Sequence, residues 1–103
     1  MKEFNKLVRD QIIDIIQQNG DTAKFRVLDN DAEYIAALLA KDIEEGLELA
    51  EDLNLGEFAD KLEVLYALAK TQGFSPEQIE KARLQKRTER GGFDKRIFLE
   101  STN

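Results

Sequence analysis

Apolar residues recur at helical spacing in four segments of the chain, and residues that start or stop helices separate these segments. The first predicted helix runs from Leu7 to Gln18 and stops at Asn19-Gly20. The second starts at Asp29-Asn30-Asp31, whose side chains suit a helix N-cap, and continues to about Leu53. This pattern limits the chain to a fold built from packed helices.

The third and fourth predicted helices have clear boundaries. Asn54-Leu55-Gly56 indicates a short turn, after which a helix from Glu57 to Gln72 is closed by Gly73. The fourth helix starts with the segment Ser75-Pro76-Glu77-Gln78, in which the serine is the N-cap, the proline takes the first helical position and the glutamine completes a capping box. Gly91-Gly92 ends this helix.

Two apolar segments lie outside the helices. In Phe25–Leu28, apolar and polar residues alternate over too few positions to form more than a short extended segment. Ile97-Phe98-Leu99 is apolar enough for the tail from Phe93 to Leu99 to pack as an ordered extension. A short turn makes consecutive helices antiparallel neighbours. We therefore predict one all-α domain over residues 1–103, an antiparallel four-helix bundle with a short extended C-terminal tail.

The length of 103 residues suits one domain, and a helical chain of this size often needs a second subunit to bury its apolar faces. No apolar run approaches the ~20 residues that cross a bilayer. The opening Met1–Asn5 contains an acid and leads into a periodic segment, so it does not resemble a signal peptide. We expect a cytoplasmic protein that does not bind membranes.

The chain has no cysteine and no histidine, which excludes disulfides, thiolate or imidazole catalysis and the usual zinc ligands. Any bound metal must therefore be a hard cation held by oxygen. Magnesium, manganese and calcium are the candidates.

The net charge of -6 is unevenly distributed and argues against general nucleic-acid binding. Between Lys81 and Arg96 seven basic and two acidic residues give a local charge of +5, so the rest of the chain carries -11. An acidic body beside a basic segment suits a protein that binds a metal next to polyphosphate oxygens. The alternative is a solvated basic helix face.

Two acidic pairs stand on consecutive predicted helices: Glu45 with Glu48, and Glu57 with Asp60. Each pair is spaced i, i+3, so its two carboxylates project from one side of a helix and can converge on one ion. Because the helices are predicted to be antiparallel neighbours, the two pairs can meet and supply four ligands to a hard metal.

The helical wheel places these acids on faces that should be packed. At 100° per residue, Leu38 lies within ~40° of Glu45, and Val64 lies within ~40° of Asp60. Buried carboxylates are costly unless they are paired, protonated or bound to a cation. Glu63, one turn beyond Asp60, is either a further ligand, a base that orients water, or a surface residue.

The same segments resemble the motifs of a known family. The run Lys41–Glu48 is similar to the K-x-x-E-E-x-x-E signature, and Glu57–Asp60 to the E-x-x-D, of the MazG-like all-α nucleoside triphosphate pyrophosphohydrolases. The opening Asn5–Asp10 and the closing Glu89–Arg96 resemble those of a small phosphoribosyl-ATP pyrophosphohydrolase-like subgroup. The resemblance covers Asn5 to Leu99.

This resemblance implies magnesium-dependent hydrolysis of a nucleoside triphosphate, either standard or non-standard, to the monophosphate and pyrophosphate, as in cleansing of the nucleotide pool. The implied metal ligands are Glu45, Glu48, Glu57 and Asp60, with manganese as a substitute ion and a homodimer or dimer-based tetramer as the assembly. The implied substrate contacts are Lys6, Arg9, Lys41, Glu63, Arg90, Lys95 and Arg96.

Phosphoryl chemistry requires mainly positioning and charge neutralisation, so water is the expected nucleophile, with Glu45 or Glu48 as the base. Two other hypotheses stay open. The substrate could instead be phosphoribosyl-ATP, or the chain could be a non-catalytic acidic helical interaction module whose carboxylates only solvate one face.

Overall fold

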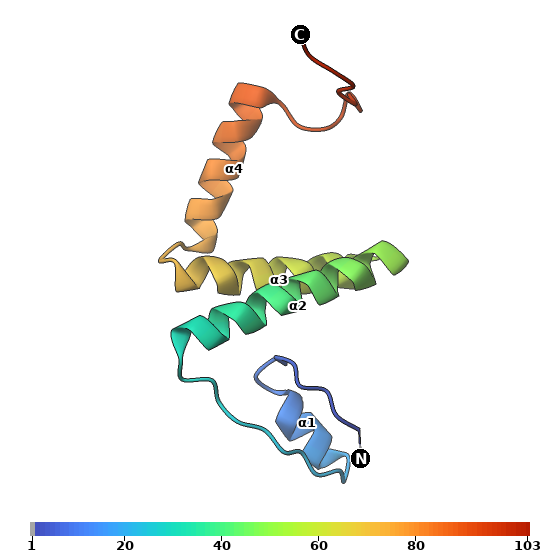
Figure 1. Cartoon of the computed structure of the whole chain (residues 1–103), viewed down its shortest axis with the longest axis vertical. Helices are drawn as coiled ribbons and strands as arrows, with labels where there is room; N and C mark the ends of the chain where they lie inside the picture. The colour runs from blue at the N-terminus through green and yellow to red at the C-terminus, as the bar shows by residue number, and fades with distance from the viewer. Residues whose placement is uncertain (1) are drawn as a thin grey trace.

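A computed structural model describes residues 2–103, which form four helices and no strand. The helices are α1 (Ile12–Gln18), α2 (Asp31–Glu51), α3 (Leu55–Thr71) and α4 (Pro76–Arg90). Figure 1 shows α2 and α3 side by side as an antiparallel hairpin, with α1 on one side of it and α4 extending from the other. The prediction of an all-α chain with four helices is confirmed.

Asparagine side chains cap both helices of the hairpin. The Oδ1 atom of Asn30 accepts a hydrogen bond from the backbone N–H of Glu33 at 3.0 Å, and that of Asn54 accepts one from Glu57 at 2.9 Å. Since Asn54 is the N-cap, α3 begins at Leu55. The prediction that residues 54–56 form a turn before the helix was therefore wrong for the last two of them.

The first helix is shorter than predicted. It begins at Ile12 instead of Leu7, after a turn in which the N–H of Ile12 donates to the carbonyl of Arg9 at 3.1 Å. Gln11, at the N-cap, makes no side-chain capping bond. The residues before α1 are positioned instead by ion pairs to α2 and α3, which explains why the apolar periodicity from Leu7 did not continue the helix.

The start of α4 agrees with its sequence signal, whereas the tail after it does not. Ser75 Oγ accepts from the N–H of Gln78 at 3.2 Å, and Gln78 Oε1 accepts from the N–H of Ser75 at 2.8 Å, which completes the predicted capping box. Gly91 ends the helix at a φ of 85°, a conformation that favours glycine. The expected packing of Ile97–Leu99 is not found, because α4 directs the tail away from the hairpin and Phe98 is 87% exposed.

The hairpin supplies nearly all of the packing within one chain. Among residues 2–103, α2 and α3 are the only helix pair in extensive contact, and the only buried side chains are Leu38, Val64 and Glu45. The radius of gyration is 17.8 Å, against about 13 Å for a compact domain of this length. One chain therefore contains a helical hairpin with two flanking helices and does not close into a bundle by itself.

An ion pair joins the two helices of the hairpin. Lys61 Nζ donates to Asp42 Oδ1 at 2.7 Å and to the Asp42 backbone carbonyl at 3.3 Å. Gly46 lies beside this pair, and a Cβ atom there would stand 3.5 Å from Lys61 Nζ, an ordinary contact. No helix within residues 2–103 combines the length and apolar character that a membrane crossing requires.

Gly46→Ala should stabilise the protein, because glycine inside a helix costs conformational entropy and the added methyl group meets no obstacle in the chain. The expected gain in the free energy of unfolding is about 0.5–1 kcal/mol. Chemical denaturation at fixed protein concentration measures it. A loss of stability would show that Gly46 is needed for close approach of another helix.

Candidate metal centre

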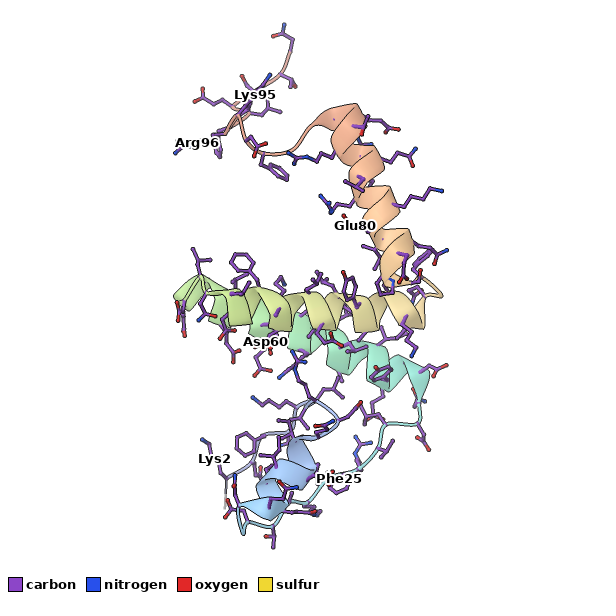
Figure 2. The ribbon with its side chains drawn as sticks, turned by 180° about the vertical axis from the view of Figure 1, so that it is seen from behind. Lys2, Phe25, Asp60, Glu80, Lys95 and Arg96 are labelled. Atoms are coloured by element: carbon purple, nitrogen blue, oxygen red, sulfur yellow. The ribbon has the colours of Figure 1, made fainter. Side chains whose placement is uncertain are left out.

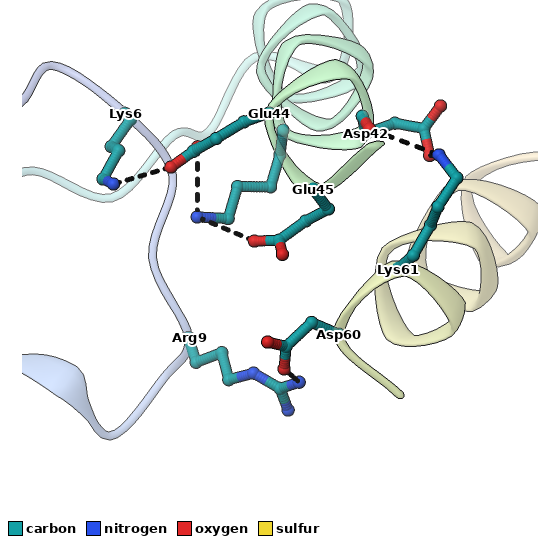
Figure 3. A network of polar contacts seen from close by, with 8 residues as sticks. Lys6, Arg9, Asp42, Glu44, Glu45, Asp60 and Lys61 are labelled. Atoms are coloured by element: carbon teal, nitrogen blue, oxygen red, sulfur yellow. Dashed lines mark hydrogen bonds and ion pairs between the residues drawn. The ribbon is translucent and has the colours of Figure 1, made fainter. Parts of the chain in front are cut away.

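Three carboxylates from the two helices of the hairpin converge at one place. One oxygen of each of Glu45, Glu57 and Asp60 lies within 4.8 Å of the others. Glu45 comes from the second half of α2, and the other two come from the first turns of α3. Figure 3 shows Glu45 and Asp60 pointing toward each other across the gap between their helices. The antiparallel hairpin thus brings together the acids that the sequence places 12 and 15 residues apart.

Two oxygens of this cluster are buried without a hydrogen-bond partner. They are Oε2 of Glu45 and Oε2 of Glu57. Only 7% of the Glu45 side chain is exposed, although glutamate is rarely buried unless it is paired. A buried carboxylate oxygen without a donor loses its hydration and gains nothing in return, which costs stability. The cluster is therefore a place where a bound cation would relieve an existing electrostatic cost.

The surroundings raise the pKa of two of these acids. Burial is the main cause for Glu45, and the negative charge of Glu48 adds to it, while Lys41 opposes the increase in pKa. Burial also raises the pKa of Glu57, followed by the charges of Asp60 and Glu45. Both shifts oppose ionisation, so without a cation this cluster disfavours the charge state that would bind one.

Basic side chains surround the acids on the side of α1. Arg9 donates to Asp60 Oδ1 at 2.7 Å, and Lys41 Nζ lies 3.4 Å from Glu45 Oε1. Lys6 Nζ donates to Glu44 Oε1 at 2.7 Å, and Lys41 donates to the other oxygen of Glu44 at 3.2 Å. The N-terminal segment is therefore attached to the hairpin at its acidic side (Figure 3).

The remaining predicted site residues lie in two places, on or beside the helices that carry the acids and at the far end of α4. Glu48 is exposed and lies outside the three-residue cluster, yet it is close enough for its charge to raise the pKa of Glu45. Glu63 is exposed on α3. Lys6, Arg9 and Lys41 lie beside the acids. Figure 2 shows Lys95 and Arg96 beyond the far end of α4, well away from Asp60, so one chain does not bring its basic C-terminal residues to its own acids.

Two further acidic residues contribute to this region, and spacing along one helix does not identify either of them. Glu44 lies about 100° around α2 from Glu45, so helical spacing alone does not assign it to the cluster. Glu44 is half-buried, and its carboxylate forms ion pairs with both Lys6 and Lys41. The pair with Lys6 holds the N-terminal segment in place. Asp42 was not singled out, and its pairing with Lys61 depends on the register between α2 and α3, which spacing along one helix does not reveal.

The donor set suits a hard divalent cation. All three converging ligands are carboxylates, two of their oxygens have no partner, and the chain contains no cysteine and no histidine. Glu45, Glu57 and Asp60 could hold such an ion together with water, and Glu48 could join from the solvent side. These residues therefore fit magnesium or manganese.

Comparisons with protein-family models, with curated proteins and with solved structures gave no match.

Replacement of Glu45 by glutamine tests the electrostatic cost of the cluster. Because the pKa of Glu45 in the folded state is raised above its ordinary value of 4.5, folding favours the protonated form of this residue. The contribution of Glu45 to the free energy of unfolding of wild type therefore falls as pH rises through that range. Glu45→Gln cannot lose a proton. In chelator, the free energy of unfolding of the variant minus that of wild type should increase between about pH 4 and pH 8.

Measuring a difference between two proteins cancels the titration of acids whose pKa does not depend on Glu45, such as Glu44, whose pKa is lowered by Lys6 and whose contribution has the opposite sign. Urea denaturation at several pH values gives the two curves. A difference that stays constant or falls with pH would contradict a costly charge at Glu45.

Proposed function

We propose that this protein is a magnesium-dependent nucleotide pyrophosphohydrolase of the MazG-like kind, which hydrolyses a nucleoside triphosphate to the monophosphate and pyrophosphate. The observation that carries the proposal is the pair of buried, unbonded oxygens of Glu45 and Glu57, facing Asp60 and bordered by Arg9 and Lys41. Two buried carboxylate oxygens that lack a partner are thus adjacent to basic side chains. A magnesium–polyphosphate complex would offer the acids a cation and the basic side chains phosphate oxygens.

In this proposal the acids hold the ion and the basic residues hold the phosphates. Magnesium, when bound, would offset the negative charge that develops on the leaving pyrophosphate. Arg9 would exchange Asp60 for a phosphate oxygen, because its side chain is 57% exposed and its guanidinium can turn toward a ligand. Lys41 and Lys6 would remain anchored to Glu44 and contribute positive charge beside the substrate.

Glu48 is the carboxylate best suited to accept a proton from the attacking water. It is exposed to solvent and lies one helical turn from Glu45 on the same side of α2. Glu45 is buried and, with an ion present, would be fully used as a ligand. Of the two candidate bases from the sequence, Glu48 therefore has access to water while Glu45 does not.

Two other functions make different demands on this cluster. A phosphoribosyl-ATP hydrolase would use the same acids and bases, so the two activities differ only in substrate. A non-catalytic interaction module would need exposed acids that neighbouring side chains or water satisfy. The unbonded buried oxygens of Glu45 and Glu57 favour the metal-dependent enzyme over such a module.

A panel of nucleoside triphosphates together with phosphoribosyl-ATP, assayed with magnesium and with chelator, tests the function. We expect turnover only with the metal, and monophosphate plus pyrophosphate as products. Release of inorganic phosphate and a diphosphate would place the cleavage at the other anhydride bond and contradict the proposal, as would a complete lack of turnover.

Magnesium should also stabilise the folded protein, since an ion that binds only the native state adds RT ln(1 + [L]/Kd) to its stability. At 100 times the dissociation constant this is about 2.7 kcal/mol. Thermal unfolding in magnesium and in chelator measures the shift, and sodium chloride at equal ionic strength is the control. Equal midpoints in magnesium and in chelator would exclude a metal site.

Asp60→Asn should reduce turnover at least ~100-fold, because it removes one ligand charge from an ion that stabilises the transition state. Folding should persist, because the amide is similar in size and relieves repulsion with Glu57. Glu51→Gln, a loss of one exposed acid near the end of α2, is the matched control and should retain activity. Near-normal turnover by Asp60→Asn would remove this residue from the site.

A further inference from the structure

The segment before α1 is attached to the hairpin by charge. Residues 2–11, which we call the strap, contain no helix, and nearly all of their side chains are exposed. Lys6 donates to Glu44 on α2 at 2.7 Å, and Arg9 donates to Asp60 on α3 at 2.7 Å. Within residues 2–103 only α2 and α3 pack extensively against each other, so no helix packing holds the strap. Its position over the acidic side therefore depends on these two ion pairs.

The two ion pairs of the strap differ in their relation to the metal centre. Glu44, the partner of Lys6, lies outside the three converging acids and also accepts a hydrogen bond from Lys41 at 3.2 Å. Asp60, the partner of Arg9, is one of the three. A cation bound among the converging acids would leave the first pair intact and compete with the second. We call Lys6–Glu44 the anchor and Arg9–Asp60 the latch.

In the empty protein the latch places a cation at the edge of the metal centre. Figure 3 shows the guanidinium of Arg9 at Asp60, beside the gap that Glu45 faces. This cation satisfies only part of the cluster, since Glu45 and Glu57 each keep a buried oxygen without a hydrogen-bond partner. A guanidinium is planar and donates from its edge, whereas a small hard ion accepts oxygens from several directions at once. Arg9 is therefore an incomplete substitute for a metal ion.

The latch and a divalent ion oppose each other at Asp60. Together on this carboxylate they would place two positive charges side by side, and the repulsion is twice that between unit charges at the same separation. The latch is also easily broken, because the side chains of Arg9 and Asp60 are 57% and 42% exposed and exposed ion pairs contribute little net stability. Arg9 therefore has to leave Asp60 when the centre is filled, while the anchor stays in place.

We infer that the strap closes the metal centre of the empty protein, and that a divalent ion opens it by displacing Arg9 from Asp60. The inference rests on the metal centre of the proposed function and is independent of the hydrolysis. Two consequences follow for this site. Free metal binds more weakly than the acids alone would allow, and the guanidinium of Arg9 becomes available to an anion only when the centre holds an ion.

Manganese binding without any nucleotide tests the competition. Arg9→Gln should bind the free ion about tenfold more tightly than wild type, because the variant removes a competing cation and its repulsion. Arg9→Lys keeps the positive charge and should return most of the way to the wild-type affinity. Electron paramagnetic resonance of unbound manganese near neutral pH measures all three. Equal affinities of wild type and Arg9→Gln, or a weaker affinity of the variant, would overturn the inference.

Arg26→Gln is the matched control, since it removes one positive charge elsewhere in the same half of the chain. Arg26 pairs with Glu33, which precedes Glu45 by 12 residues, or about 18 Å along α2. At physiological ionic strength this exceeds the distance over which exposed charges interact, so manganese affinity should change less than about twofold. A change as large as that of Arg9→Gln would assign the effect to net charge and overturn the inference.

Limited proteolysis of wild type reads the release of the strap directly. Trypsin cleaves after arginine and lysine, and its rate follows the population of the opened segment. Magnesium should accelerate cleavage after Arg9 at least about threefold relative to cleavage after Lys24, an exposed residue between α1 and α2, because it increases the population of the released strap. Mass spectrometry of the early fragments gives this ratio, and sodium chloride at equal ionic strength is the control.

Asp60→Asn supplies the reference for a released latch. Its amide carries no charge to hold Arg9, so cleavage after Arg9 should be fast in chelator and should not respond to magnesium. If magnesium binds to wild type and leaves the ratio of the two cleavage rates unchanged, the strap does not respond to the ion and the inference is wrong.

These measurements separate the inference from the proposed function. If wild type hydrolyses no nucleotide, yet magnesium releases Arg9 and Arg9→Gln binds manganese more tightly, the function is wrong and the strap acts as inferred. If wild type is active but neither metal affinity nor cleavage depends on the latch, the function stands and the inference is wrong. Absence of metal binding in both wild type and Arg9→Gln would overturn both.

Discussion

The buried charge of Glu45 is the constraint on which the rest of this structure depends. It occupies the position on α2 that follows Leu38 by two turns, where an apolar residue would normally pack against α3. With Glu57 and Asp60 opposite, the hairpin brings three carboxylates together in place of an apolar contact. Such an arrangement is costly unless cations compensate its charges or some of its carboxyl groups are protonated. Lys41 and Arg9 supply part of the compensation, and the unbonded oxygens show that part is lacking.

The same constraint explains how the flanking segments are arranged. The N-terminal segment before α1 is not helical, and Lys6 and Arg9 attach it to acids on α2 and α3. The apolar residues of α2 and α3 that do not pack against each other lie on the other side of the hairpin. One side therefore carries the converging acids, and the other carries exposed apolar residues.

The sequence predicted the local features well and the global ones only in part. Capping by Asn30, Ser75 and Gln78 depends on side chains within three residues of each other, so the signal is complete in the sequence. The convergence of Glu45 with Asp60 followed from helical spacing and one short turn. By contrast, the length of α1 depended on ion pairs to residues more than 30 positions away, and the tail of Ile97–Leu99 had no surface in its own chain to pack against. Spacing along one helix carries no information on either.

Within residues 2–103, the helices of one chain therefore do not form a closed bundle. A helical hairpin with two buried apolar residues cannot offset the conformational entropy of ordering about a hundred residues. Covering the face of Leu39, Ile43 and Leu47 by a second hairpin would supply the missing core. Polar substitutions at these three positions should consequently reduce the stability of the protein, because they would remove apolar area from such a contact.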